Sequence, residues 1–123
     1  MNEKILIADD EPNIVISLEF LLKREGFDVS VARDGQETLD AIRRDRPRLV
    51  LLDVMMPKKS GYDVCQEVRA DEAIKDTKIL MLTAKGRELD IAKGLAMGAD
   101  DYMTKPFSTK ELVLKVRELL GGT

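Results

Sequence analysis

Short apolar runs alternate along the chain with longer stretches in which apolar residues recur every three or four positions. Three of the runs, at residues 5–8, 49–52 and 79–82, are apolar at every position. Apolar runs without alternation are typical of strands that are buried on both faces, as in a parallel sheet. Two weaker runs, at residues 29–32 and 101–104, bring the predicted strands to five.

A stretch with helical periodicity follows each predicted strand, and we expect helices at about residues 12–25, 36–44, 61–70, 87–97 and 108–120. Their ends carry residues that favour helix termini: the first-turn Pro12, the glycines Gly26 and Gly98, the N-cap candidates Asp34 and Ser60, and a capping-box pattern from Ser108 to Glu111. Strand and helix alternating five times predict an α/β fold with right-handed crossovers and helices on both faces of one sheet.

Two of the predicted helices have apolar residues on both sides. We expect one face of each to be buried, and these faces consist of Ile14, Val15, Leu18, Leu21 and Leu22 in the first helix and Leu112, Val113, Val116, Leu119 and Leu120 in the last. Ile16 and Phe20 point away from the first of these faces, and Leu114 points away from the second. These three residues are candidate contacts for partners.

Composition narrows the class of protein. The 123 residues are 44% hydrophobic and 35% charged, which is typical of one globular domain covering residues 1–123. A net charge of −3 argues against a dedicated nucleic-acid-binding domain. The absence of histidine excludes His-based catalysis and His-ligated zinc, and a single cysteine excludes an internal disulfide.

The chain shows no sign of a targeting signal or a membrane span. Its first residues run directly into a short apolar stretch that ends in Asp9 and Asp10. No apolar run approaches the roughly 18 residues that a spanning helix needs. We therefore expect a cytoplasmic protein that does not contact a membrane.

Polar residues follow four of the five predicted strands. Asp9 and Asp10 come after the first, Asp53 after the third, Thr83 after the fourth and Lys105 after the fifth. The carboxyl ends of parallel strands meet at one edge of a sheet, which is where function is found in such folds. A single acid after a strand is common and is weak evidence. Polar residues at four strand ends that meet at one edge predict a functional site.

The residue types in this predicted site fit phosphoryl transfer. Three carboxylates held together repel one another and raise each other's pKa, so a cation must compensate. An all-oxygen site suits Mg²⁺ or Mn²⁺. Lys105 adds a positive charge and Thr83 a hydroxyl, while one aspartate could attack phosphorus. Neither a P-loop pattern nor a dinucleotide-binding glycine pattern occurs in the sequence.

The chain resembles the receiver domains of two-component response regulators. The matching segments are Asp9 and Asp10, residues 51–57 with Ser60 and Gly61, residues 82–84, and residues 98–107. They span the whole chain in the family's order and spacing. The resemblance implies a flavodoxin-like three-layer fold, with a five-stranded parallel sheet in the order 2-1-3-4-5 and five helices.

The resemblance also implies roles for the site residues. Asp53 would be the phosphoacceptor. Asp10 and Asp53 would bind Mg²⁺ directly together with the backbone carbonyl of Met55, and Asp9 would act through a water molecule. Lys105 would contact the phosphoryl group.

A conformational switch is implied as well. Thr83 would move toward the phosphoryl group while Tyr102 turns inward. The Lys105–Pro106 peptide bond is expected to be cis, because a cis bond there would aim Lys105 into the acidic pocket.

The partners implied by the resemblance are a histidine kinase or phosphotransfer protein, which would contact the first helix, and an output domain or protein. Residues 98–107 are most similar to receivers fused to winged-helix DNA-binding domains, which favours a receiver that belongs to a longer regulator. Such receivers dimerise when phosphorylated, and the corresponding output face here would comprise Lys93, Asp100, Asp101, Glu111, Leu114 and Lys115. Ile91 stands where these relatives usually have a basic residue facing an acid such as Glu111, which removes one expected ion pair.

Three other functions remain open at this stage. Aspartyl-phosphate phosphohydrolases usually have Asp-x-Asp after the first strand, whereas Asp9 and Asp10 are adjacent. A flavin-binding module needs a hydroxyl- and glycine-rich loop there, and the acids would repel the flavin phosphate. A degenerate receiver that acts as a scaffold would not need the complete set of site residues. Phosphoryl labelling, phosphate-ester turnover and colour distinguish these functions.

Overall fold

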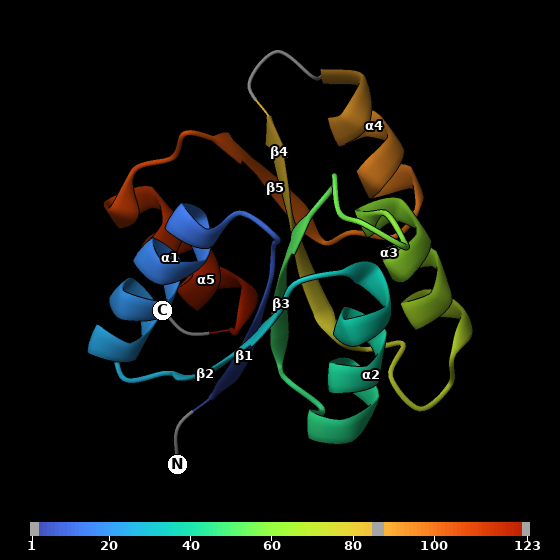
Figure 1. Ribbon diagram of the computed structural model, residues 1–123, viewed down its shortest axis with the longest axis horizontal. Helices are drawn as coiled ribbons and strands as arrows, with labels where there is room; N and C mark the ends of the chain where they lie inside the picture. Colours follow the sequence, from blue (N-terminus) through green and yellow to red (C-terminus); the bar gives the residue numbers. More distant parts are fainter. Residues whose placement is uncertain (1–2, 85–87, 122–123) are drawn as a thin grey trace.

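The computed structural model describes residues 3–84 and 88–121. Five parallel strands form one sheet in the order β2-β1-β3-β4-β5 (Figure 1). The strands are β1 (Lys4–Ala8), β2 (Asp28–Ala32), β3 (Leu49–Asp53), β4 (Lys78–Ala84) and β5 (Asp101–Lys105). The helices are α1 (Pro12–Arg24), α2 (Gly35–Asp45), α3 (Gly61–Ala70), α4 (Glu88–Ala96) and α5 (Thr109–Leu119).

The helices cover both faces of the sheet. In Figure 1, α1 and α5 lie on one side of the strands, and α2, α3 and α4 lie on the other. The predicted flavodoxin-like fold with strand order 2-1-3-4-5 is confirmed. The predicted start of the fourth helix at residue 87 falls outside the described residues.

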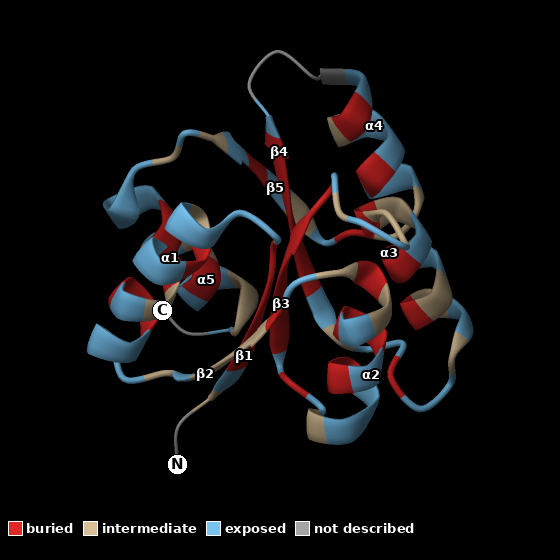
Figure 2. Ribbon diagram, in the orientation of Figure 1, coloured by how far each residue is buried: buried red, intermediate tan, exposed pale blue. Residues whose placement is uncertain are grey.

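Two apolar cores result from this arrangement, one on each face. Successive residues of a strand point to opposite faces, so Ile5 and Ile7 pack with α1 and α5 while Leu6 and Ala8 pack with α2 and α3. All four are fully buried, as the red strands at the centre of Figure 2 show. Double coverage explains why the central runs of these strands, at residues 5–8, 49–52 and 79–82, are apolar at every position.

The predicted helix termini are observed in most details. The Asp34 carboxylate accepts the Glu37 amide N–H at the start of α2, and Ser108 caps α5 through the Glu111 N–H. The reciprocal capping box forms at α3, between Ser60 and Asp63. None of the helices in the described part of the chain has the length and apolar character that crossing a membrane requires.

The faces of the two amphipathic helices also agree with the pattern. Within α1, four of the five residues predicted for the core are buried and Ile14 is partly buried, whereas Ile16 and Phe20 are 64% and 68% exposed. Within α5, Leu112 and Val116 are buried, and Leu114 is exposed. Val113, Leu119 and Leu120 are only partly buried because they lie at the margin of the core.

Candidate functional site

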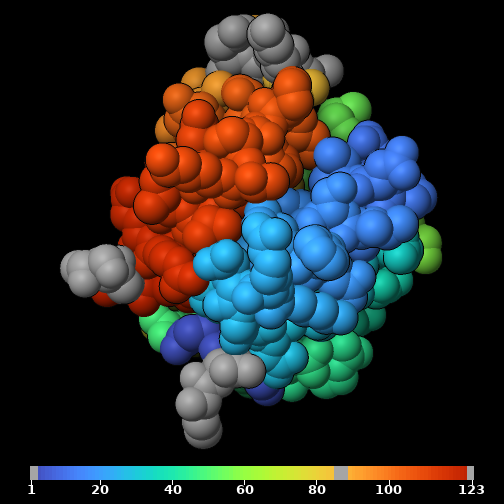
Figure 3. Space-filling view, turned by 90° about the vertical axis from the view of Figure 1, so that its left-hand side faces the viewer, coloured from blue at the N-terminus to red at the C-terminus, as the bar shows by residue number. Residues whose placement is uncertain are grey.

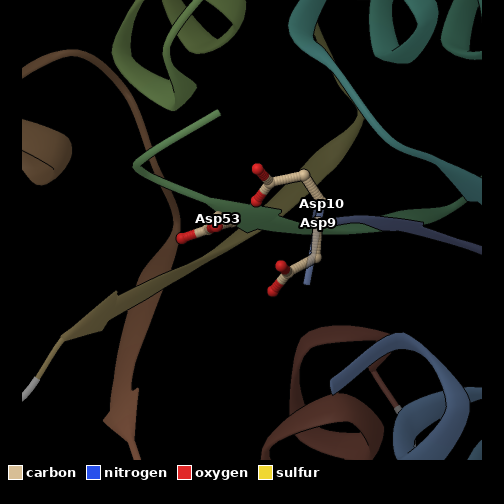
Figure 4. A group of neighbouring side chains, drawn as sticks. All are labelled: Asp9, Asp10 and Asp53. Atoms are coloured by element: carbon tan, nitrogen blue, oxygen red, sulfur yellow. The ribbon is translucent and has the colours of Figure 1, made fainter. Parts of the chain in front are cut away.

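Three aspartates meet at the carboxyl edge of the sheet. Asp9 and Asp10 directly follow β1, and Asp53 is the last residue of β3, which pairs with β1. One carboxylate oxygen from each lies within 4.8 Å of the others (Figure 4). Asp9 is fully buried, Asp53 is 8% exposed and Asp10 is open to solvent. The structure therefore brings together the three acids that the strand ends predicted.

Lys105 reaches the same place from the end of β5. Its Nζ donates to Asp9 Oδ2 at 2.8 Å and lies 3.5 Å from Asp53 Oδ1. The Lys105–Pro106 peptide bond is cis. Thr83 is buried near the end of β4, and its hydroxyl donates to the Met103 carbonyl at 3.5 Å.

The charges in this cluster do not balance. Burial and the negative charge of Asp9 raise the pKa of Asp53 to about 6, against the opposing effects of Lys105 and the Met55 N–H. Burial disfavours the Lys105 ammonium, but its hydrogen bond to Asp9 and the charge of Asp53 outweigh burial and raise the Lys105 pKa. One lysine thus faces three carboxylates, and a hard divalent cation with oxygen ligands fits the remaining negative charge.

Met55 lies at the rim of this cluster. Its backbone N–H donates to Asp53 Oδ1 at 3.3 Å, so its main chain adjoins the acids. Its side chain is 60% exposed. The expected position of Met55 beside the site is therefore observed, and its carbonyl remains a predicted ligand.

Four of the six residues predicted for the output face lie together. Asp101, Glu111, Leu114 and Lys115 line one surface hollow beside Tyr102, which is 38% exposed. Lys115 Nζ and Asp101 Oδ2 form an ion pair at 2.8 Å.

The other two predicted output residues have partners on α3, and their assignment to the output face stays a prediction. Lys93 Nζ lies 4.4 Å from the centre of the Tyr62 ring, a cation–π contact that holds it on the α3 side of α4. Asp100 pairs with Arg69 of α3 at 2.9 Å. The resemblance did not indicate that Lys93 of α4 and Asp100, which precedes β5, have partners on a neighbouring helix.

Arg69 is a residue that the sequence analysis missed. Its guanidinium donates to the backbone carbonyls of Gly98, Lys75 and Thr77 at 2.8, 2.7 and 2.7 Å, and to Asp100 Oδ2. Asp100 Oδ2 also accepts the Ile79 N–H. Nothing in the sequence separates Arg69 from other arginines near helix ends, because its partners come from two connections, α3–β4 and α4–β5.

A doubly wound sheet with acids and a lysine at its carboxyl edge defines a class of signalling domain, and comparison with known proteins identifies the family. Residues 5–117 match the family model described as the response regulator receiver domain. The chain belongs to this family and is a signalling switch of two-component systems.

Individual relatives agree with this assignment. The chain is 48% identical over 120 residues to the alkaline phosphatase synthesis transcriptional regulatory protein PhoP of Bacillus subtilis, covering 98% of this chain and 49% of that protein. The chain therefore spans about half the length of that relative. A protein described as a response regulator from Chloroflexus aurantiacus has a TM-score of 0.95 at 36% identity, with 98% of this chain and 99% of that chain covered.

A second solved structure bears on the metal. The receiver domain of a sensor histidine kinase from Pseudomonas aeruginosa has a TM-score of 0.91 at 30% identity, with 99% of this chain and all of that chain covered. Its structure has a magnesium ion coordinated in the active-site cleft. Receiver domains bind Mg²⁺ at an acidic cluster of the kind formed here by Asp9, Asp10 and Asp53.

Proposed function

We propose that Asp53 accepts a phosphoryl group in a Mg²⁺-dependent reaction, and that the resulting change of state controls an output domain or partner. The observation that carries this proposal is the convergence of three carboxylates and Lys105 at the carboxyl edge of the sheet. Asp53 is buried, with 8% of its surface still exposed.

The phosphoryl group comes from a phosphohistidine of a histidine kinase or phosphotransfer protein, the partner that membership of the receiver family implies. An Asp53 carboxylate oxygen attacks phosphorus, an O–P bond forms and the N–P bond breaks. The electron pair leaves on the donor's imidazole nitrogen, which takes up a proton. The Lys105 ammonium stabilises negative charge on the phosphoryl oxygens. Water later cleaves the acyl phosphate, which releases phosphate and restores the carboxylate.

The residues present fit a magnesium site. Asp10, Asp53 and the Met55 backbone carbonyl would be direct ligands, with Asp9 acting through a water molecule, and Mn²⁺ could replace Mg²⁺. When bound, the cation neutralises the carboxylates and the phosphoryl oxygens, so that an anionic donor can approach.

Labelling with a small phosphoryl donor tests the proposal. The wild-type domain should incorporate phosphate only with Mg²⁺ or Mn²⁺, and Asp53→Asn should not label. Asp40→Asn is the matched control, because Asp40 is an exposed carboxylate on α2. Undiminished labelling of Asp53→Asn would refute the role of Asp53.

Thr83 and Tyr102 are the proposed switch. Thr83 is buried next to the site, whereas Tyr102 is partly exposed on the adjacent strand. Phosphorylation turns the Thr83 hydroxyl toward the phosphoryl group and draws Tyr102 inward. Thr83→Val should therefore still label but should lose the change in the Tyr102 ring signals in NMR spectra; a full change in this variant would contradict the role of Thr83.

The α1 surface is the proposed contact for the phosphoryl-donor protein. Ile16 and Phe20 are exposed on this helix, and Figure 3 looks onto this face, with α1 in blue beside β5 and α5 in orange to red. Phe20→Ser should slow transfer from the kinase and leave labelling by a small donor unchanged. Equal losses with both donors would indicate damaged folding instead.

The hollow beside α5 is the proposed output face, and we propose that it forms a homodimer after phosphorylation. Leu114 is exposed among Glu111, Glu118 and the Asp101–Lys115 ion pair, which gives an apolar centre with charged surroundings. Sedimentation of the phosphorylated domain should show a dimer that Leu114→Asp abolishes while labelling persists. A monomer in both states at high micromolar concentration would contradict the dimer.

A further inference from the structure

We infer that Gly35, the first residue of α2, is a positioning residue for the magnesium site, because it fixes the β3–α3 loop (residues 54–60) that carries Met55. The inference rests on the proposed function and adds a part of the molecule that contributes no atom to the site. Gly35 touches neither the carboxylates nor Lys105, and it acts through the loop.

The loop approaches Gly35 too closely for any other residue. A Cβ at this position would lie 2.2 Å from the Lys59 backbone oxygen and 2.4 Å from the Lys59 Cβ. The φ angle of Gly35 is not positive, so its backbone conformation is open to all residues. Glycine is required here only because a side chain would have no room: Lys59 of the loop occupies the position of its Cβ.

A hydrogen bond joins the two segments at this contact. The Gly35 N–H donates to the Pro57 carbonyl at 3.2 Å. The same carbonyl accepts the Lys59 N–H at 2.8 Å, which closes a γ-turn around Lys58. Lys58 has φ +68°, a strained value for a residue with a side chain, and such strain persists only where the surroundings hold it. The start of α2 provides that support.

The β3–α3 loop connects this contact to the site, because Met55 in the loop lies only two residues after Asp53. Met55 is hydrogen-bonded to Asp53, and the Gly61 N–H donates to the Val54 carbonyl at 2.9 Å. A Cβ on Gly61 would lie 2.5 Å from the Asp53 backbone oxygen, so the far end of the loop is packed as closely as the middle. Any shift at residues 57–59 therefore displaces the Met55 backbone.

An ion pair adds a smaller contribution at the same junction. Lys58 Nζ lies 3.6 Å from Asp34 Oδ2, while the other oxygen of Asp34 caps α2. The Lys58 side chain is largely exposed, so this pair contributes less than the backbone contact.

The experiment measures Mg²⁺ binding by calorimetry and amide hydrogen exchange in the metal-free protein. Gly35→Ala should weaken Mg²⁺ binding about tenfold and should speed exchange of the Lys59 N–H. Labelling of Gly35→Ala by a small donor should be reduced at low Mg²⁺ and should recover at saturating Mg²⁺, because Gly35 acts on the affinity for Mg²⁺. Ile42→Val is the control: it trims the buried face of the same helix, lowers stability, and should leave Mg²⁺ affinity unchanged.

A second variant keeps the test decisive if Gly35→Ala does not fold. Lys58→Met removes a positive charge near the site, so electrostatics alone would strengthen Mg²⁺ binding, whereas loss of support for the loop weakens it about twofold. Tighter or unchanged binding in Lys58→Met, or wild-type affinity and exchange in a folded Gly35→Ala, overturns the inference alone. A wild-type domain that binds no Mg²⁺ overturns the proposed function as well.

Discussion

The Arg69 cluster and the acidic cluster, both partly buried, differ in how completely their charges are compensated. In the Arg69 cluster, the Arg69 guanidinium pairs with the Asp100 carboxylate and with the carbonyl oxygens of Gly98, Lys75 and Thr77. Lys78 Nζ lies 4.0 Å from the other Asp100 oxygen, so positive charge is not lacking there. The acidic cluster sets Lys105 against Asp9, Asp10 and Asp53. The charges of the Arg69 cluster are compensated within the protein, whereas those of the acidic cluster are compensated only when a cation is bound.

This difference separates a structural role from a functional one. Where a charge has all its partners, removing one partner is destabilising because it leaves the others partly buried and unpaired. Carboxylates held together without enough positive charge lower stability, and they are retained where they bind something. The two clusters should therefore respond to mutation with opposite signs.

Removing the Arg69 guanidinium should have the largest effect. Arg69→Met keeps the aliphatic stem but removes the donor to three carbonyls, which should lower the free energy of unfolding by about 3 kcal/mol. Asp100 would keep the Ile79 N–H and Lys78, whose Nζ lies 4.0 Å away. Urea denaturation measures this loss, and labelling of Asp53 should persist in the folded variant. Arg43→Met, which breaks an exposed pair with Asp71, should cost less than about 1 kcal/mol. Equally small losses of stability in Arg69→Met and Arg43→Met would contradict a structural role for the Arg69 cluster.

Neutralising Asp53 should have the opposite sign. Its pKa of about 6 means that ionisation is disfavoured in the folded state, so Asp53→Asn should raise the metal-free stability at pH 7 by about 2 kcal/mol. Asp100→Asn is the matched change in the Arg69 cluster and should be destabilising. Destabilisation by both Asp53→Asn and Asp100→Asn would show that repulsion among the carboxylates of the acidic cluster does not lower stability.

The acidic cluster could be anticipated from the sequence, whereas the Arg69 cluster could not. Asp9 directly follows β1 and Asp53 is the last residue of β3, so parallel pairing of these strands alone brings the two acids together. The strands and helices could be predicted because the periodicity of apolar residues is also a local property of the sequence. Arg69 meets carbonyls from the α3–β4 and α4–β5 connections, whose paths no local pattern specifies.

The partners of surface side chains were not foreseen from the sequence. Lys93 and Asp100 were assigned to the output face by resemblance, but each found a partner on α3. The close contact between Gly35 and the β3–α3 loop was also not foreseen, since it depends on how α2 packs beside α3. Helical periodicity identifies a buried face but not which neighbour that face meets.

The pH dependence of the Asp53→Asn effect should sharpen the comparison. The folded pKa of Asp53 is raised to about 6, above an unfolded value of about 3.9, so the folded state binds more protons between these values. The contribution of Asp53 to stability is therefore greatest below about pH 4 and is lost as the pH rises through about 6. The stability gained by Asp53→Asn should grow over this range by about 1 kcal/mol per pH unit.

Saturating Mg²⁺ provides the control for this experiment. The wild-type domain should regain stability with the metal, because only the folded state holds the site. The advantage of Asp53→Asn at pH 7 should then shrink or reverse. A difference between the two proteins that is the same at every pH, with or without Mg²⁺, would mean that Asp53 ionises freely in the fold.

Met55 should have the smallest effect on stability and a measurable effect on the phosphorylated state. Its side chain is 60% exposed beside Asp53, so substitutions should change stability by less than about 0.5 kcal/mol. A thioether cannot orient a water molecule as a carboxylate or an amide can. Met55→Glu and Met55→Asn should therefore accelerate loss of phosphate, which is measured as decay of the label after the donor is removed. Met55→Leu, of similar size and also apolar, should decay like the wild type. Unchanged or slower decay in both polar variants would show that the exposed rim of the acidic cluster does not control access of water to the phosphoryl group.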